Sequence, residues 1–257
     1  MKRKIFMATI LLSAVSMSIL SGCKKVLDYI VTRPGGVAKI CRIERITANH
    51  DTMWFDYNKR GDPVAIRYAS TPPEDDIYTD DRAYKYDHQN RLVVFLEQAI
   101  PSAEDPSGAL WWHKYTHVNK NLIVDTAFEY AQGDWKTSDR PEFGSDEAGT
   151  IVTTFILDNY GRVIREMGGI WNVDKTYSYD SNGNLVKPGV TYSNKINIRQ
   201  TSRTWMFIDR DYSVNSPVGE ASTFNSFGLP VKLDIMPLFV NGNDDDYRDV
   251  AVDYKCN

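Results

Sequence analysis

The chain has 257 residues, of which 42% are hydrophobic and 25% are charged, and its formal net charge is −4. This composition is typical of a globular protein and excludes a low-complexity chain. The acidic balance argues against nucleic-acid binding, which depends on an excess of Lys and Arg. The length allows one or two domains, and all-β domains often reach this size as a single unit.

Residues 1–22 have the features of an export signal. Lys2, Arg3 and Lys4 give a positive start, and residues 5–20 carry no charged side chain. This uncharged segment is shorter than the roughly 20 residues that a membrane-spanning helix needs. A transmembrane anchor and an ordinary secretory signal remain the alternatives to a lipoprotein signal.

The run Leu20-Ser21-Gly22-Cys23 resembles the lipobox of bacterial lipoproteins. The resemblance implies that the chain is cut after Gly22 and that a diacylglycerol is joined to the Cys23 sulfur. Several acyl chains on one residue hold a protein on a membrane far more firmly than one chain does. Removing the three basic residues of the signal lowers the formal charge from −4 to −7.

The residues after Cys23 bear on location. Lys24 and Lys25 follow the cysteine without an Asp that would retain the protein in the inner membrane, and Asp28 is the first acid. We therefore expect a lipid-anchored protein of the outer membrane, with the periplasmic face favoured over the cell surface. Residues 23–36 are predicted to form the lipidated anchor and a linker.

Five short segments in residues 37–257 share one turn pattern. Each has an apolar or aromatic residue, then Asp or Asn, two free positions, and Gly or Asn. Asp or Asn at the start of a type I turn bonds its own backbone, and Gly or Asn adopts the left-handed conformation that ends a bulged hairpin. The segments are 57–61, 86–90, 157–161, 179–183 and 224–228, with a degenerate copy at 113–123.

Alternating apolar residues flank these turns, as expected for half-buried strands. We predict one all-β domain over residues 37–257, an antiparallel meander of successive hairpins curled into a barrel, a sandwich or a curved repeat sheet. Helix is not expected after the signal, and 70–81 and 132–149 are predicted surface loops. The predicted strands are 38–48, 51–57, 63–69, 82–87, 91–99, 110–118, 122–131, 150–157, 162–172, 175–180, 190–198, 203–212, 221–225, 229–238 and 248–256.

Residues 177–185 resemble the YD repeat of Rhs-type proteins, and residues 224–230 resemble its Gly-Leu-Pro variant. Together with the lipobox, Cys41-Arg42-Ile43 and the final Tyr254-Lys255-Cys256-Asn257, the chain resembles small YD-repeat-like lipoproteins of Bacteroidota. The resemblance implies β-hairpins. It does not imply toxin delivery, because the copies are few and no toxin domain follows them.

Cys41 and Cys256 are the cysteines that remain after lipidation. The oxidising cell envelope permits a disulfide between them, and such a pair would join the first and last strands and close the sheet on itself. The alternative is that both are small buried hydrophobic residues.

Trp111 and Trp112 are candidates for stacking against a sugar, with core packing as the alternative. Neighbouring residues of a strand point to opposite faces, so at most one of these rings can enter the core. His113 and His117 would share a face, but no third ligand has a recognisable spacing, and we predict no metal site. The acidic run 241–249 suits weak calcium binding or a solvated hairpin tip.

No G-x-S-x-G, H-E-x-x-H or Walker motif occurs, and we predict no cofactor. The sequence favours a non-enzymatic binding or assembly module with a lipid membrane, an envelope protein or a glycan as partner. A glycan-binding lipoprotein of polysaccharide uptake and a hydrolase with an unfamiliar site are the alternatives. A cleft with convergent acids would favour the hydrolase, and a groove floored by exposed Trp or Tyr would favour the glycan-binding protein.

Overall fold

The computed structural model describes residues 37, 40–49, 52–69, 82–98, 110–129, 131–132, 142–143, 149–235, 238 and 248–256. The proposed signal, Cys23 and the linker lie outside the described residues. So do 70–81, most of the predicted loop 132–149, and residues 241–247 of the acidic run. Among the described residues, no helix is long and apolar enough to cross a membrane.

The described chain is mainly β-structure, as the sequence predicted. The first half contains β1 (Cys41–Thr47), β2 (Thr52–Tyr57), β3 (Pro63–Tyr68), β4 (Arg82–Tyr86), β5 (Leu92–Gln98), β6 (Leu110–Asn119), β7 (Leu122–Glu129), β8 (Ala131–Gln132) and β9 (Glu142–Phe143). The second half contains β10 (Thr150–Leu157), β11 (Val163–Gly168), β12 (Val173–Thr176), β13 (Tyr192–Ile196), η2 (Ile198–Thr201), α2 (Arg203–Asp209), β14 (Asn215–Pro217), β15 (Ala221–Phe224), β16 (Pro230–Ile235) and β17 (Arg248–Cys256).

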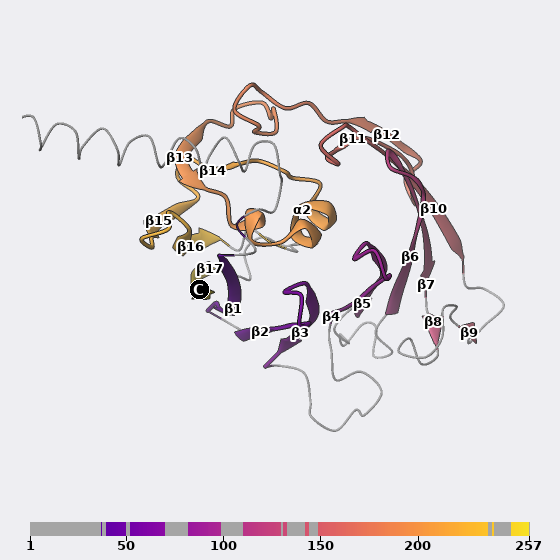
Figure 1. Cartoon of the computed structure of the whole chain (residues 1–257), viewed down its shortest axis with the longest axis horizontal. Helices are drawn as coiled ribbons and strands as arrows, with labels where there is room; N and C mark the ends of the chain where they lie inside the picture. The colour runs from indigo at the N-terminus through magenta and orange to yellow at the C-terminus, as the bar shows by residue number, and fades with distance from the viewer. Residues whose placement is uncertain are drawn as a thin grey trace, which may run out of the picture.

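Thirteen of the described strands form one sheet in the order β12-β11-β10-β7-β6-β5-β4-β3-β2-β1-β17-β16-β15. Every neighbouring pair is antiparallel. This confirms the predicted meander of hairpins. Figure 1 shows that the sheet follows an open arc around α2, so the curved sheet is the form that the chain adopts.

The first and last strands pair, but their pairing does not close the sheet. Cys41 in β1 lies opposite Cys256 in β17, and both strands are interior strands of the sheet. The edges are instead β12 and β15, and residues 177–220 connect one edge to the other across the gap (Figure 1). The expectation that a bond between the first and last strands would close the sheet is therefore wrong, because three strands lie beyond β1 on the C-terminal side.

The five predicted turns share one set of hydrogen bonds. In the turn of residues 158–161, the Gly161 N–H donates to the Asp158 carbonyl at 3.1 Å. The Asp158 carboxylate accepts from the backbone N–H of Tyr160 at 2.8 Å and of Arg162 at 2.9 Å. The left-handed residues of the five turns are Gly61, Asn90, Gly161, Gly183 and Gly228. The turn prediction is confirmed in all five copies, and the β6–β7 hairpin matches the degenerate copy, where the Asn121 N–H donates to the Asn119 side chain at 2.8 Å.

The left-handed position of these turns gives a stability prediction. Gly161 has φ = 76°, a conformation that a β-branched residue adopts poorly. We expect Gly161→Val to lower the free energy of unfolding by about 1 kcal/mol or more, measured by denaturant titration. Gly149→Val is the matched control, because Gly149 lacks a positive φ and no atom lies within 4 Å of its added Cβ. Equal stability of the two variants would contradict the bulged-turn assignment.

The predicted strand 203–212 is wrong, because residues 203–209 form α2. The Ser202 side chain accepts from the Thr204 N–H, and Arg210 ends the helix in the left-handed conformation. The four consecutive residues 204–207 are all buried. Four successive residues of a helix span most of its circumference, so α2 is enclosed on several sides, in agreement with its place inside the arc of the sheet (Figure 1).

The two faces of the sheet carry separate apolar clusters. The larger cluster lies on the concave face and includes Phe55, Tyr84 and Phe155 together with Trp205 and Phe207 of α2. Aromatic rings make the contact with the helix, since Trp205 meets Phe55 and Tyr84 edge to face at centroid distances of 5.7 and 5.5 Å. The smaller cluster lies on the opposite face of β4 to β7 and consists of Ala83, Val94, Leu96, Trp112 and Phe128.

The connections between strands divide between the two ends of the sheet. Because neighbouring strands are antiparallel, the turns at 58–61, 87–90, 158–161 and 225–228 and the β6–β7 turn all fall at one end, which we call the turn end. The connections that follow β3, β5 and β7 leave from the opposite end. β1 runs antiparallel to β2, so Cys41, at its start, also lies at the turn end.

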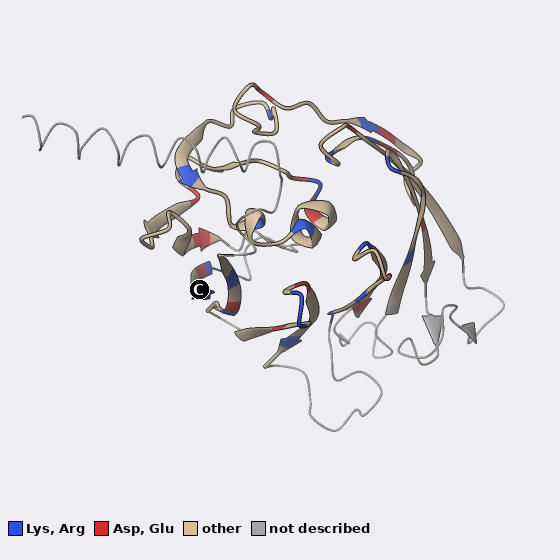
Figure 2. Ribbon diagram, viewed as in Figure 1, with Lys and Arg blue, Asp and Glu red and all other residues tan. Residues whose placement is uncertain are grey.

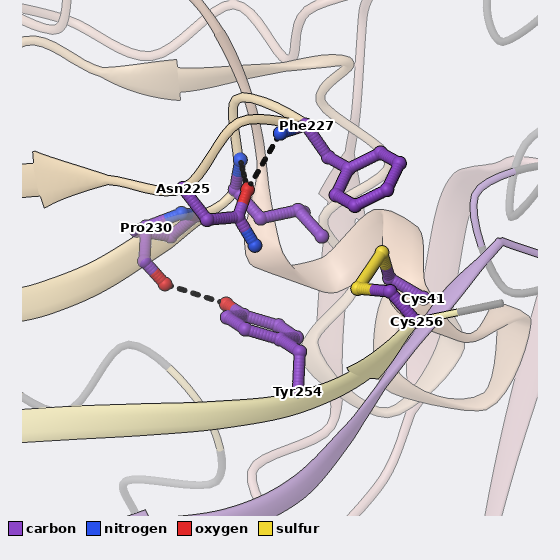
Figure 3. Close-up of a disulfide and its surroundings, with 7 residues drawn as sticks. Cys41, Asn225, Phe227, Pro230, Tyr254 and Cys256 are labelled. Carbon is purple, nitrogen blue, oxygen red and sulfur yellow. Dashed lines mark hydrogen bonds between the residues drawn. A yellow bond between two sulfur atoms is a disulfide. The ribbon is translucent and has the colours of Figure 1, made fainter.

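A disulfide joins Cys41 and Cys256 at the turn end (Figure 3). Their Cα atoms are 4.1 Å apart, and 215 residues separate them along the chain. The neighbouring Tyr254 hydroxyl donates to the Pro230 carbonyl at 2.6 Å. The bond therefore joins the start of the described sheet to its last strand beside the turn of residues 225–228.

Candidate functional site

A cavity of about 650 Å³ opens at the turn end, between the sheet and the start of α2. Four hairpins and the helix contribute to its wall. Its lining consists of Arg60, Gly61, Asp62, Tyr86, Asn90, Arg91, Leu92, His117, Val118, Asn119, Lys120, Ile123, Leu157, Gly161, Ser202, Arg203, Thr204, Phe207 and Tyr212. Ligand cavities commonly have volumes of about 300–1,000 Å³, so this cavity has the size of a small-molecule site.

The floor of the cavity is apolar. Leu92, Ile123, Leu157 and Phe207 line it, and each is at least nine-tenths buried. They come from β5, β7, β10 and α2, which the chain brings together only because the sheet curves around the helix. The floor can therefore accept the apolar part of a ligand.

Tyr86 attaches the helix to the sheet at the side of the cavity. Its hydroxyl lies 2.8 Å from the Pro63 carbonyl, to which it donates, and 2.8 Å from the Thr204 hydroxyl. Burial raises the pKa of Tyr86, and burial likewise raises the pKa of Tyr212, which also lines the cavity. Both side chains therefore remain neutral hydroxyls at physiological pH and do not supply a phenolate base.

The rim of the cavity is basic although the chain is acidic. Among the described residues that line it, Arg60, Arg91, Lys120 and Arg203 are positive and Asp62 is the one carboxylate. The four basic side chains are exposed. Figure 2 draws Lys and Arg in blue, and blue segments lie on α2 and on the turns that face it. The cavity mouth therefore carries an excess of positive charge.

The turns neutralise one cation of the rim. The Arg91 Nε donates to the Asp87 carboxylate at 2.8 Å, which is already a hydrogen-bond acceptor within its own turn. Burial opposes ionisation of Asp87, but hydrogen bonds from Arg91 and Gln89 outweigh that effect and lower the pKa of the carboxyl. Asp87 is therefore ionised at neutral pH and satisfies much of the charge of Arg91.

The other three cations have weaker partners. Arg203 donates to the Tyr160 carbonyl at 3.4 Å, and Arg60 donates to the Asn90 side-chain oxygen at 3.5 Å. Within the described part of the chain, Arg60, Lys120 and Arg203 form no ion pair. Their charges are therefore available to a ligand at the mouth of the cavity.

Asp62 does not neutralise these cations directly. Its two oxygens accept from the side-chain amides of Asn90 at 2.8 Å and Asn58 at 3.1 Å. This bridge joins the β2–β3 turn to the β4–β5 turn and fixes the spacing of the rim. Because it is the one carboxylate among the described lining residues, the cavity lacks the pair of acids that glycoside hydrolysis uses.

The two tryptophans predicted as glycan contacts lie elsewhere. Trp112 is completely buried in the smaller cluster, on the face of β4 to β7 opposite the concave face. Its ring is therefore covered and has no surface for a sugar. Trp111 is half-buried and its ring centroid lies 6.3 Å from that of His113. As expected from strand geometry, the two neighbours point to opposite faces, but they do not form a shared platform.

The two histidines considered as metal ligands have different partners. His113 Nδ1 lies 2.9 Å from the buried Asp125 carboxylate. His117 donates its Nε2–H to the Leu92 carbonyl at 2.9 Å. Within the described residues, no three His, Cys, Asp or Glu side chains lie close enough together to hold a metal ion.

Sequence reasoning singled out one cavity residue, His117, as a possible metal ligand, and it missed the basic rim. Several hairpins carry a basic residue within or next to their turns, as at Arg60, Arg91 and Lys120. This pattern predicts a shared site only once the turns are known to lie at one end of the sheet. No protein-family model and no curated protein matches this chain.

Proposed function

We propose that this chain is a membrane-anchored envelope lipoprotein whose β-rich domain is a non-enzymatic binding module, with its ligand site in the cavity at the turn end. The observation that carries the proposal is the combination of a ligand-sized cavity with one lining carboxylate among the described residues. A site that holds substrate for hydrolysis needs a nucleophile or an acid and base that face each other. The cavity wall instead offers neutral hydroxyls, cations and apolar side chains, which suit binding.

The same wall argues against the glycan-binding alternative at this site. Sugar sites present exposed aromatic faces, and no Trp is among the described residues that line the cavity. Three other aromatic residues line it, namely Tyr86, Tyr212 and Phe207. Tyr212 and Phe207 are more than nine-tenths buried and pack in the core. Tyr86 is partly buried, and its hydroxyl is already bonded to the Pro63 carbonyl and the Thr204 hydroxyl. We therefore favour a ligand that uses charge at the rim and apolar contact at the floor.

The proposed membrane attachment rests on the Leu20-Ser21-Gly22-Cys23 run. This run follows a basic start and an uncharged segment, which is the order found in lipoprotein signals. Lys24 and Lys25 support the outer membrane as the destination, with the domain on the periplasmic face. The predicted family of small YD-repeat-like lipoproteins is consistent with the five shared turns.

Attachment is tested by removing the acceptor thiol. We expect Cys23→Ala to give an unlipidated precursor that moves from the detergent phase to the aqueous phase in Triton X-114 partitioning. Lys24→Ala is the matched control, because it changes the neighbouring residue and leaves the lipobox intact, and it should stay in the detergent phase. Unchanged partitioning of Cys23→Ala would contradict the lipid anchor.

Binding is tested by obstructing the mouth of the cavity. Val118 lines the cavity and is 55% exposed, so Val118→Trp adds bulk there without removing core packing. Native mass spectrometry of protein purified from its own membranes should show a small molecule on the wild type that is lost from Val118→Trp. Val186→Trp is the control, because Val186 is similarly exposed and does not line the cavity. An equal bound mass on both variants would contradict the assignment of the site.

A further inference from the structure

We propose that the cavity at the turn end binds an anionic amphiphile, a molecule with a phosphate or carboxylate head and an apolar body. This inference rests on the proposed function, since it assigns the ligand class of the same cavity. The head would lie at the rim among Arg60, Lys120 and Arg203, and the apolar body would lie on the floor.

The convergence of charge supports the anionic head. Arg60 comes from the β2–β3 turn, Lys120 from the β6–β7 turn and Arg203 from the start of α2, so residues far apart in the sequence meet at one opening. Like charges that face one opening repel one another, and this arrangement is stabilised when an anion lies between them. Two of the three are arginines, whose planar guanidinium groups match carboxylate and phosphate oxygens.

The floor supports the apolar body. Leu92, Ile123, Leu157 and Phe207 come from four different elements and present apolar atoms to the same space. A bare phosphate ion would reach the cations but would leave this surface in contact with water. A neutral hydrocarbon would cover the floor but would leave the cations unmatched. A ligand that has both parts satisfies both surfaces.

The position of the cavity relative to the proposed anchor identifies one source of such a molecule. The chain enters β1 at the turn end, where the Arg42 guanidinium lies 5.3 Å from the centre of the Tyr57 ring at the end of β2. Cys41 lies 18 positions after Cys23, and a chain of that length spans at most about 65 Å. The cavity is therefore on the end of the domain from which the anchor leaves, within reach of membrane headgroups.

The first experiment measures ligand class by isothermal titration calorimetry on the Cys23→Ala chain at low ionic strength. The probes are dodecyl phosphate and dodecanoate below their critical micelle concentrations, inorganic phosphate, and octyl glucoside as a neutral amphiphile. We expect both anionic amphiphiles to bind at least tenfold more tightly than inorganic phosphate or octyl glucoside. Their affinity should fall as salt is added, because the rim charges are exposed.

The second experiment removes the rim charge. The double variant Lys120→Gln/Arg203→Gln should weaken dodecyl phosphate binding at least tenfold. The control is Lys175→Gln/Lys232→Gln, which removes the same number of charges from exposed residues that do not line the cavity and should change the affinity by less than twofold. Circular dichroism of both variants checks that the fold is retained.

The outcomes separate this inference from the proposed function. If octyl glucoside bound as tightly as the anionic amphiphiles, or if both double variants lost the same affinity, the anionic ligand class would be overturned. If Val118→Trp still abolished binding in that case, the cavity would remain the ligand site. No binding of any probe, together with no bound mass on the native protein, would overturn both. Sedimentation with phosphatidylglycerol vesicles, compared with phosphatidylcholine vesicles, then distinguishes a membrane headgroup from a freely diffusing amphiphile.

Discussion

Replacing Trp205 with alanine should lower the free energy of unfolding by about 3–5 kcal/mol. The Trp205 side chain is completely buried and lies edge to face against Phe55 of β2 and Tyr84 of β4. Its removal opens a void between α2 and the sheet, and the surrounding strands cannot collapse into that void without changing the curvature of the sheet. Guanidinium or urea titration followed by far-UV circular dichroism measures the loss.

Trp171→Ala is the matched control for this prediction. Trp171 has 85% of its surface exposed in the β11–β12 hairpin, so the same substitution should change stability by less than about 0.5 kcal/mol. A Trp205→Ala variant as stable as Trp171→Ala would show that α2 does not form part of the core. The comparison therefore tests the packing of α2 inside the arc of the sheet. The same helix forms one wall of the cavity.

Removing the disulfide should have an effect of similar size. In the chain-entropy model, a bond that closes a loop of 215 residues stabilises the folded state by roughly 5 kcal/mol, and measured values are commonly 2–5 kcal/mol. We expect the unlipidated chain with Cys256→Ala to unfold at a lower denaturant concentration than its Cys23→Ala parent. Thiol titration of the denatured, unreduced parent should find no free thiol.

A second comparison separates the bond from the packing of its side chains. Reductant should destabilise the Cys23→Ala parent and leave the Cys41→Ala/Cys256→Ala double variant unchanged. Two free thiols in the parent, or equal sensitivity of both proteins to reductant, would show that the bond is absent in solution. Cys41 has only 1% of its surface exposed, so the double variant also reports the packing contribution of this position.

The turn module relates the fold to the proposed site. Each turn uses its own Asp or Asn to satisfy its backbone, as Asp158 and Asn225 do. A free position of the turn, such as that of Arg60, or the residue just after the turn, such as Arg91, can then carry a basic side chain without affecting the hairpin. Successive hairpins therefore present variable residues at one end of the sheet, and such residues form the cavity mouth together with Arg203 of α2.

The hairpins were predictable from the sequence because their causes are local. Asp or Asn bonds a backbone group two residues away, Gly three residues later provides the left-handed conformation, and alternation marks the strands on either side. None of these interactions depends on distant parts of the chain. The all-β class and the antiparallel meander followed directly from them.

The helix and the cavity were decided by tertiary structure. Residues 203–209 form α2 because their apolar run is enclosed by the sheet, and that enclosure depends on strands more than 100 residues away, such as those that carry Phe55 and Tyr84. The open arc likewise depends on how residues 177–220 connect β12 to β15. No local sequence pattern predicts that connection. Arg60, Lys120 and Arg203 meet at one opening because the sheet curves around the helix, and curvature arises from the packing of the whole core.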